Sequence, residues 1–142
     1  MAKITFIIGL CGSGKTHYSE VWRQKTGAKI FEGIGKSIGG NTNWSAIINH
    51  LNAGEDCIIE EMNFCFQDPR NEIIRYILNK ASGTKIEWVC FENNLESANW
   101  NVRQRTNKGD IDGHLKINEQ LHRDYTYQPG VEIIPITRIE SK

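Results

Sequence analysis

The sequence has no excess of charge of either sign, and this absence limits the partners expected for it. Its 142 residues include 17 Lys and Arg and 17 Asp and Glu, so the formal net charge is zero. A protein that binds a polyanion or a membrane surface through its overall charge needs a clear basic excess. Any anion-binding site in this chain must therefore be built locally.

Cysteine pairs at metal-binding spacing are also missing. The closest two of the four cysteines, Cys57 and Cys65, are eight positions apart, whereas zinc sites usually pair ligands about two to four residues apart. Cys57 and Cys90 stand in apolar segments, where buried free thiols are the expected state. Free thiols are typical of a reducing compartment, so we predict a cytoplasmic location.

No apolar run approaches the ~20 residues that a membrane-spanning helix needs. The apolar run at 4–8 is too short for the core of a secretion signal and leads straight into Gly9 and Lys15. We therefore expect no membrane partner. Repeats, low-complexity segments and linkers are missing too, and the length suits a single domain over residues 1–142.

Short apolar runs alternate along the chain with segments of helical periodicity. Strands rich in β-branched and aromatic residues are predicted at 4–8, 28–31, 57–59, 85–91 and 131–136. Helices are predicted at 16–25, 44–52, 95–103 and 114–127, with another from an Asp68 N-cap to Gly83, and loops at 32–43 and 106–113. This α/β alternation favours a parallel sheet covered on both faces.

The most specific signal is the segment 9–16, GLCGSGKT, which matches G-x-x-x-x-G-K-[ST] at every fixed position. Its glycines let the backbone curl so that successive N–H groups point inward, and the helix that follows adds free N–H groups and its positive dipole end. Lys15 is expected at the β- and γ-phosphates of ATP or GTP, and the Thr16 hydroxyl at Mg²⁺. The predicted nucleotide-binding residues are Gly9, Cys11, Gly12, Ser13, Gly14, Lys15 and Thr16.

Two carboxylates, Glu60 and Glu61, follow the predicted strand 57–59. Proteins with this loop motif hold magnesium with a carboxylate at the end of a neighbouring strand. Because side chains alternate along a strand, only one of the two can face the loop. The spacing does not say which, and a solvated strand end is the alternative interpretation of both.

The stretch IIEEMNF at 58–64, followed by Pro69-Arg70, resembles the I-I-x-D-T-N-L … R stretch of small P-loop kinases. These AAA-type proteins are related to the polynucleotide 5′-kinase domain and include zeta-toxin-like and other small-molecule kinases. The resemblance matches Asn63 with the family Asn and Glu61 with the family Asp. It thereby implies that Glu61 joins Thr16 as a metal ligand, although Glu replaces Asp.

The resemblance extends in order along nearly the whole chain. WNVRQR at 100–105 is similar to the Arg-Asn-x-x-Arg of the family lid, with Trp in place of the first Arg and the last Arg displaced by one. The family implies a P-loop NTPase three-layer α/β/α sandwich with a five-stranded parallel sheet in the order 2-3-1-4-5. It also implies a small Arg-containing lid, here at about 101–113.

Catalytic candidates come from the lid and from the second strand. Arg103, Arg105 and Lys108 cluster near Gly109 and suit a lid that closes on phosphates; a solvated helix end is the alternative. The resemblance suggests a base just after the second strand, where Glu32 is the nearest carboxylate, and an ordinary loop Glu is equally compatible. With Lys15, the predicted catalytic residues are Arg103, Arg105 and Glu32.

The function expected from these features is that of a kinase using ATP and Mg²⁺. Its acceptor would be a nucleotide, a nucleic-acid 5′-hydroxyl or a related small metabolite, with Trp44, Phe64 or Phe66 stacking on a base and Arg70 meeting a phosphate. The alternatives are an NTP-binding or NTP-hydrolysing module that works through a partner, and a sugar-nucleotide kinase. The acceptor, the base preference and the oligomeric state stay open.

Overall fold

A computed structural model describes residues 2–32, 42–105 and 110–140. Its strands form one sheet in which every neighbouring pair is parallel, in the order β2-β3-β1-β4-β5. The predicted parallel sheet and its strand order are thus confirmed. The strands are β1 (Lys3–Ile8), β2 (Lys29–Glu32), β3 (Cys57–Glu60), β4 (Lys85–Phe91) and β5 (Ile133–Ile134).

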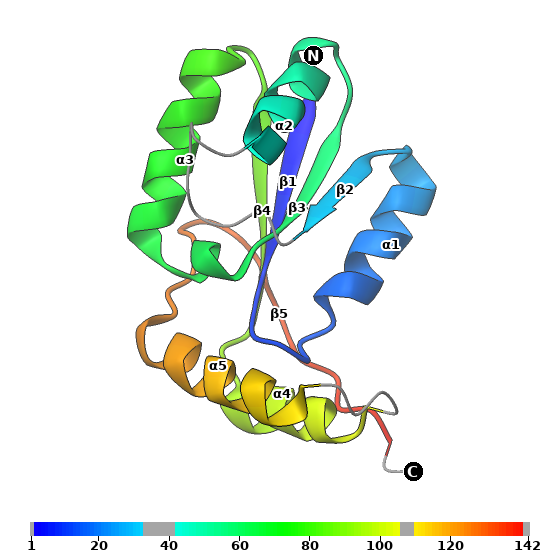
Figure 1. The fold of residues 1–142 in the computed structure, drawn as a ribbon, viewed down its shortest axis with the longest axis vertical. Coiled ribbons are helices and arrows are strands. Elements are labelled where there is room, and N and C mark those ends of the chain that lie inside the picture. Colours follow the sequence, from blue (N-terminus) through cyan, green and yellow to red (C-terminus); the bar gives the residue numbers. More distant parts are fainter. Residues whose placement is uncertain (1, 33–41, 106–109, 141–142) are drawn as a thin grey trace.

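Helices lie on both sides of the sheet and at one of its ends. Figure 1 shows α2 and α3 on one side and α1 on the other, while α4 and α5 lie beyond the carboxyl ends of the strands. Both faces of the sheet are therefore covered, as the alternation predicted. The helices are α1 (Lys15–Thr26), α2 (Thr42–Asn52), the 3-10 turn η1 (Met62–Cys65), α3 (Gln67–Lys80), α4 (Leu95–Arg103) and α5 (Ile111–Asp124).

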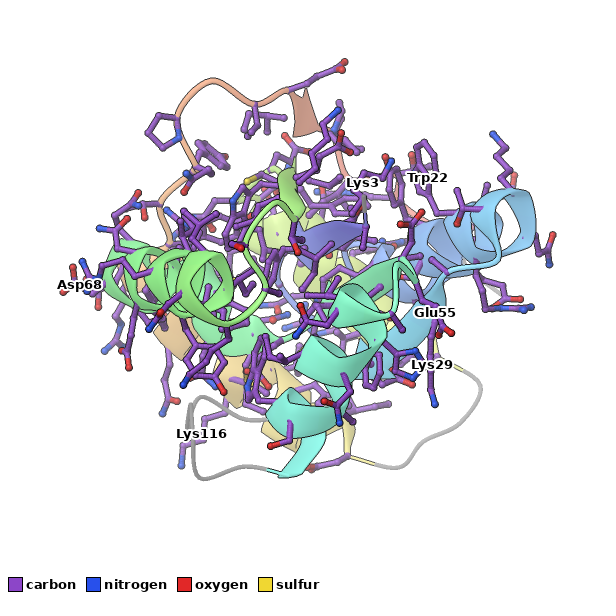
Figure 2. All side chains as sticks on the ribbon, turned by 90° about the horizontal axis from the view of Figure 1, so that it is seen from above. Lys3, Trp22, Lys29, Glu55, Asp68 and Lys116 are labelled. Atoms are coloured by element: carbon purple, nitrogen blue, oxygen red, sulfur yellow. The ribbon has the colours of Figure 1, made fainter. Side chains whose placement is uncertain are left out.

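The alternation of side chains along β1 builds two cores. Phe6 points toward α2 and α3, where its ring stacks on Trp88 with centroids 4.2 Å apart. Ile7 points toward α1 and packs in a smaller cluster with Phe91. On this second side, Lys3 lies 5.6 Å from the ring of Trp22, and Figure 2 shows the two side by side. Burial on both faces explains why the apolar residues of β1 are not restricted to alternate positions.

Several predicted boundaries were wrong, most clearly at the starts of α3 and α5 and in the last strand. Helix α3 begins at Gln67 rather than after Asp68, which lies exposed in the first turn where a carboxylate favours the helix dipole. Helix α5 begins at Ile111, because the Asp110 carboxylate caps the Gly113 N–H at 3.1 Å. The last strand pairs only over Ile133–Ile134.

The segment predicted as a lid, 101–113, consists of different parts. Its start belongs to α4 and its end to α5, while 106–109, with Lys108, lie outside the described residues. Most of the predicted acceptor loop also lies outside them, at 33–41. Among the described residues, no helix combines the length and the apolar character needed to cross a bilayer.

Candidate functional site

A glycine-rich loop, residues 9–14, connects β1 to α1, and Lys15 and Thr16 are the first two residues of that helix. Gly12 and Gly14 adopt positive φ angles of 86° and 106°, a region that other residues rarely enter. Gly14 is the N-cap of α1, and the first helical hydrogen bond runs from the Tyr18 N–H to the Gly14 carbonyl at 3.0 Å. The N–H groups before Tyr18 therefore have no partner within the helix.

Two asparagines from α4 and α5 hold this loop from outside. Asn118, which is fully buried, accepts from the Cys11 N–H at 2.7 Å and donates to the Cys11 carbonyl at 2.9 Å. The Asn101 amide donates to the Gly12 carbonyl at 2.9 Å. The loop conformation is thus fixed by side chains about ninety and more positions away in the sequence.

The Lys15 side chain folds back over the loop. Its ammonium donates to the carbonyls of Gly9 and Leu10, both at 2.8 Å. Burial lowers the pKa of Lys15, while neighbouring thiols and Glu60 act in the opposite direction and Arg105 adds to the lowering. Because burial disfavours the charged form of Lys15, an anion bound beside the loop would stabilise that charge.

A cleft of about 670 Å³ opens beside the glycine-rich loop. The carboxyl ends of β1, β2 and β3 meet there, the position where open parallel sheets bind ligands. Beyond the loop itself, the lining includes three carboxylates, three basic side chains, side chains from several other elements and a wall formed by residues 134–139. These residues are Glu32, Glu60, Glu61, His17, Arg105, His114, Tyr18, Met62, Phe91, Asn101, Ile134, Pro135, Thr137 and Ile139.

The two carboxylates after β3 have different partners. The Thr16 hydroxyl donates to Glu60 at 3.4 Å, near the outer limit of a hydrogen bond. The Glu61 carboxylate accepts from the backbone N–H of Asn63 at 2.8 Å and from its side-chain amide at 2.6 Å, which caps η1. Burial raises the pKa of Glu60. Hydrogen bonding to Ser19 lowers this pKa in part, and the nearby charge of Glu32 raises it further.

The predicted catalytic side chains do not all reach the cleft. Arg105 lines it and donates to His114 Nδ1 at 2.7 Å. Arg103 is exposed and is not among the residues that line the cleft. Glu32 is the last residue of β2 rather than part of a loop; its exposed side chain lines the cleft, and its backbone lies opposite Glu60 in the sheet.

The residues proposed for the acceptor lie elsewhere. Trp44 and Phe64 are buried core residues whose rings meet edge to face. Arg70 is fully buried, and burial lowers its pKa. Its guanidinium donates to Phe64, Gln67, Thr126 and Gln128. It therefore ties η1 and α3 to the segment before β5, away from the cleft, and contact with an acceptor phosphate is not supported.

Asn118 and His114 are site residues that the sequence analysis missed. The sequence did contain a signal for Asn118. It lies three residues after Leu115 and three before Leu121, on the apolar stripe of the predicted helix. A polar side chain on such a stripe needs a buried hydrogen-bond partner. No feature of the sequence identifies that partner.

Comparison with known proteins adds no assignment to this geometry. No family model matches the chain, and a search of curated proteins found no significant match.

Proposed function

We propose that this protein is an ATP-dependent kinase that transfers the γ-phosphoryl group to a hydroxyl of a nucleotide, a nucleic-acid 5′ end or a related small metabolite. The observation that carries the proposal is the glycine-rich loop itself. Two positive-φ glycines precede a helix whose first N–H groups lack helical partners, with a lysine ammonium beside them. This arrangement suits the phosphates of a nucleotide.

Phosphate binding in this proposal uses charge and backbone donors together. A triphosphate would accept from the free N–H groups at the start of α1 and from Lys15, whose hydrogen-bond acceptors among the described residues are the neutral carbonyls of Gly9 and Leu10. A charge-assisted bond to phosphate is stronger than a bond to a carbonyl. Nucleotide binding is therefore expected to draw the ammonium from Gly9 and Leu10 toward the cleft.

The donor set beside Lys15 fits magnesium. The described residues contain no group of three or more His, Cys, Asp and Glu side chains that could hold a metal by itself. Mg²⁺ usually retains several waters and takes one or two protein oxygens plus phosphate oxygens, and Thr16 with Glu60 offers such a pair. When bound, the ion would neutralise charge on the phosphates.

The remaining residues of the cleft supply the other requirements of phosphoryl transfer. Arg105 is placed to neutralise charge that develops on the transferred group. Glu32, at the end of β2, is a carboxylate that could take the proton from an acceptor hydroxyl. The cleft volume of about 670 Å³ leaves room for an acceptor beside the nucleotide.

Substitution of Glu60 by Gln is expected to raise the Mg²⁺ concentration needed for half-maximal activity by about tenfold or more. Glu61→Gln is the matched control, because it removes the same charge at the adjacent position. We expect a change of less than about threefold for that variant, since its carboxylate caps η1. A Mg²⁺ titration of both variants tests this, and the opposite ranking would assign the metal to Glu61.

Glu60→Gln also has a predictable effect on stability. Because burial raises the pKa of Glu60, wild-type stability falls as the pH rises from the ordinary carboxyl pKa through the raised one. The Gln variant lacks this titration. Urea unfolding without Mg²⁺ should therefore show it to be the more stable protein at pH 8, with the advantage disappearing at acidic pH.

Replacement of Arg105 by Ala is expected to lower the transfer rate about 100-fold while changing the Kd for ATP by less than about threefold. The reason is that its charge is needed most when the phosphoryl group moves. Arg103→Ala, an exposed arginine outside the cleft, should change neither quantity by more than about twofold. Single-turnover rates and calorimetry separate the two effects, and equal losses of rate and affinity in Arg105→Ala would contradict a role in transfer.

The acceptor class can be found with a labelling panel. The protein is incubated with γ-labelled ATP and Mg²⁺ plus nucleosides, nucleotides, 5′-hydroxyl oligonucleotides or sugar nucleotides. A labelled acceptor supports the kinase and names its substrate class. Release of labelled phosphate without any labelled acceptor would instead favour an NTP-hydrolysing module.

A further inference from the structure

We infer that Asn118 is a positioning residue that aims a backbone donor of the glycine-rich loop toward the nucleotide and thereby makes nucleotide affinity depend on α5. The inference rests on the proposed function, because it concerns the same loop. Asn118 does not itself line the cleft, but its partner Cys11 does. Its effect is exerted through the peptide groups on either side of Cys11.

The Asn118 side chain binds both polar groups of one residue. Its Oδ1 accepts from the Cys11 N–H at 2.7 Å, and its Nδ2 donates to the Cys11 carbonyl at 2.9 Å. The same Nδ2 donates to Asn99 Oδ1 at 3.0 Å, which fixes the orientation of the amide. Because Asn118 is fully buried, no water competes for these bonds.

The orientation of the Cys11 carbonyl determines where the N–H of Gly12 points. In a trans peptide, the carbonyl and the following N–H point to opposite sides. When Asn118 holds the Cys11 carbonyl toward α5, the N–H of Gly12 must point away from α5. Gly12 lines the cleft, so this N–H is a donor that Asn118 makes available to a phosphate.

The conformation of Gly12 leaves the loop few alternatives. A Cβ at this position would lie 2.4 Å from the Ala98 carbonyl of α4, so the backbone of α4 packs directly on the loop. Asn101, also on α4, holds the Gly12 carbonyl. Helices α4 and α5 thus act as a frame for the loop, and Arg105, which follows α4, is attached to the same frame.

An Asn118→Asp variant tests the donor directly, because it keeps one acceptor oxygen and removes the N–H. The ionised carboxylate would face the Cys11 carbonyl without a proton to donate, which turns an attraction into a repulsion. A protonated carboxyl regains the donor, and burial raises the pKa of such a group. The affinity lost at high pH should therefore return as the pH falls.

The experiment measures the Kd for Mg·ATP by calorimetry at pH 8 and pH 5.5, together with urea unfolding, for wild type and variant. We expect Asn118→Asp to weaken binding about 30-fold at pH 8 and less than about fivefold at pH 5.5. The ionisable groups around the loop, Lys15, Glu60, His114 and the Cys11 thiol, are the same in both proteins, so the ratio of variant to wild type is compared at each pH. Recovery at low pH is a result that general loss of packing does not produce.

Leu121→Ala on the same helix is the matched control for destabilisation. Leu121 is a buried core residue, and its truncation should cost stability while leaving the Kd of the folded protein within about twofold. If Asn118→Asp does not fold, Asn99→Ala removes only the partner that orients the amide and should weaken binding about threefold. The positioning role would be overturned if the Asn118 or Asn99 substitution left the Kd unchanged. It would also be overturned if Leu121→Ala raised the Kd by the same factor. Failure of the wild type to bind Mg·ATP would instead overturn the proposed function.

Discussion

Lys15→Ala should abolish transfer of labelled phosphate to every acceptor, with a loss of about 1,000-fold or more. The ammonium belongs to the first residue of α1, and no other described cation donates to the carbonyls of Gly9 and Leu10. Alanine leaves the backbone donors in place but removes the charge that would neutralise the phosphates. A transfer assay with γ-labelled ATP gives the result directly.

The fold should survive this substitution. The substitution removes two hydrogen bonds, to the carbonyls of Gly9 and Leu10. It also removes a cation whose burial is unfavourable, as its lowered pKa indicates. The opposing effects should leave the free energy of unfolding within about 1 kcal/mol of the wild type. Lys116→Ala is the control, because it removes an exposed charge from α5 that points outward in Figure 2. Full activity in Lys15→Ala would exclude the proposed site.

Gly12→Ala is expected to lower the free energy of unfolding by about 2–4 kcal/mol and to weaken nucleotide binding about 100-fold. Two effects combine at this position. The φ angle of 86° is unfavourable for alanine, and its Cβ would lie 2.4 Å from the Ala98 carbonyl and 3.1 Å from Val102 Cγ2. Either α4 or the loop must move, and the donors of the loop move with it.

Gly54→Ala separates the two effects. Gly54 has nearly the same φ angle, 82°, but a Cβ there meets nothing within 4 Å. This control should lose only about 1 kcal/mol, the cost of a left-handed conformation for alanine, and should keep the nucleotide affinity. Urea unfolding and calorimetry on both variants give the comparison. Equal losses of stability at the two positions would show that the close approach to α4 costs nothing.

The sheet could be predicted because its signals are local. Apolar runs such as that of β1, alternating with amphipathic segments, require a parallel sheet with both faces covered, and the structure has it. The strand order came from the resemblance to P-loop kinases and agrees with the structure. The shape of the glycine-rich loop also follows from its own residues, because Gly12 and Gly14 occupy its positive-φ positions.

The supports of the candidate site could not be predicted in the same way. Asn118 is 107 positions from Cys11, and no local pattern in the sequence connects the two. Strand alternation separates Glu60 from Glu61, but which of them contacts Thr16 depends on how β3 is placed beside β1. Arg70 looked available for a phosphate because its neutral, distant partners at 126–128 could not be foreseen.

The same amide that holds the Gly12 carbonyl also reaches the other end of the chain. Asn101 donates to the Thr137 carbonyl at 2.9 Å and accepts from the Ile139 N–H at 2.8 Å, and both residues line the cleft. During synthesis, the glycine-rich loop leaves the ribosome before residues 137–139, which complete this wall. A nascent chain would therefore carry the motif long before it possessed a finished binding site.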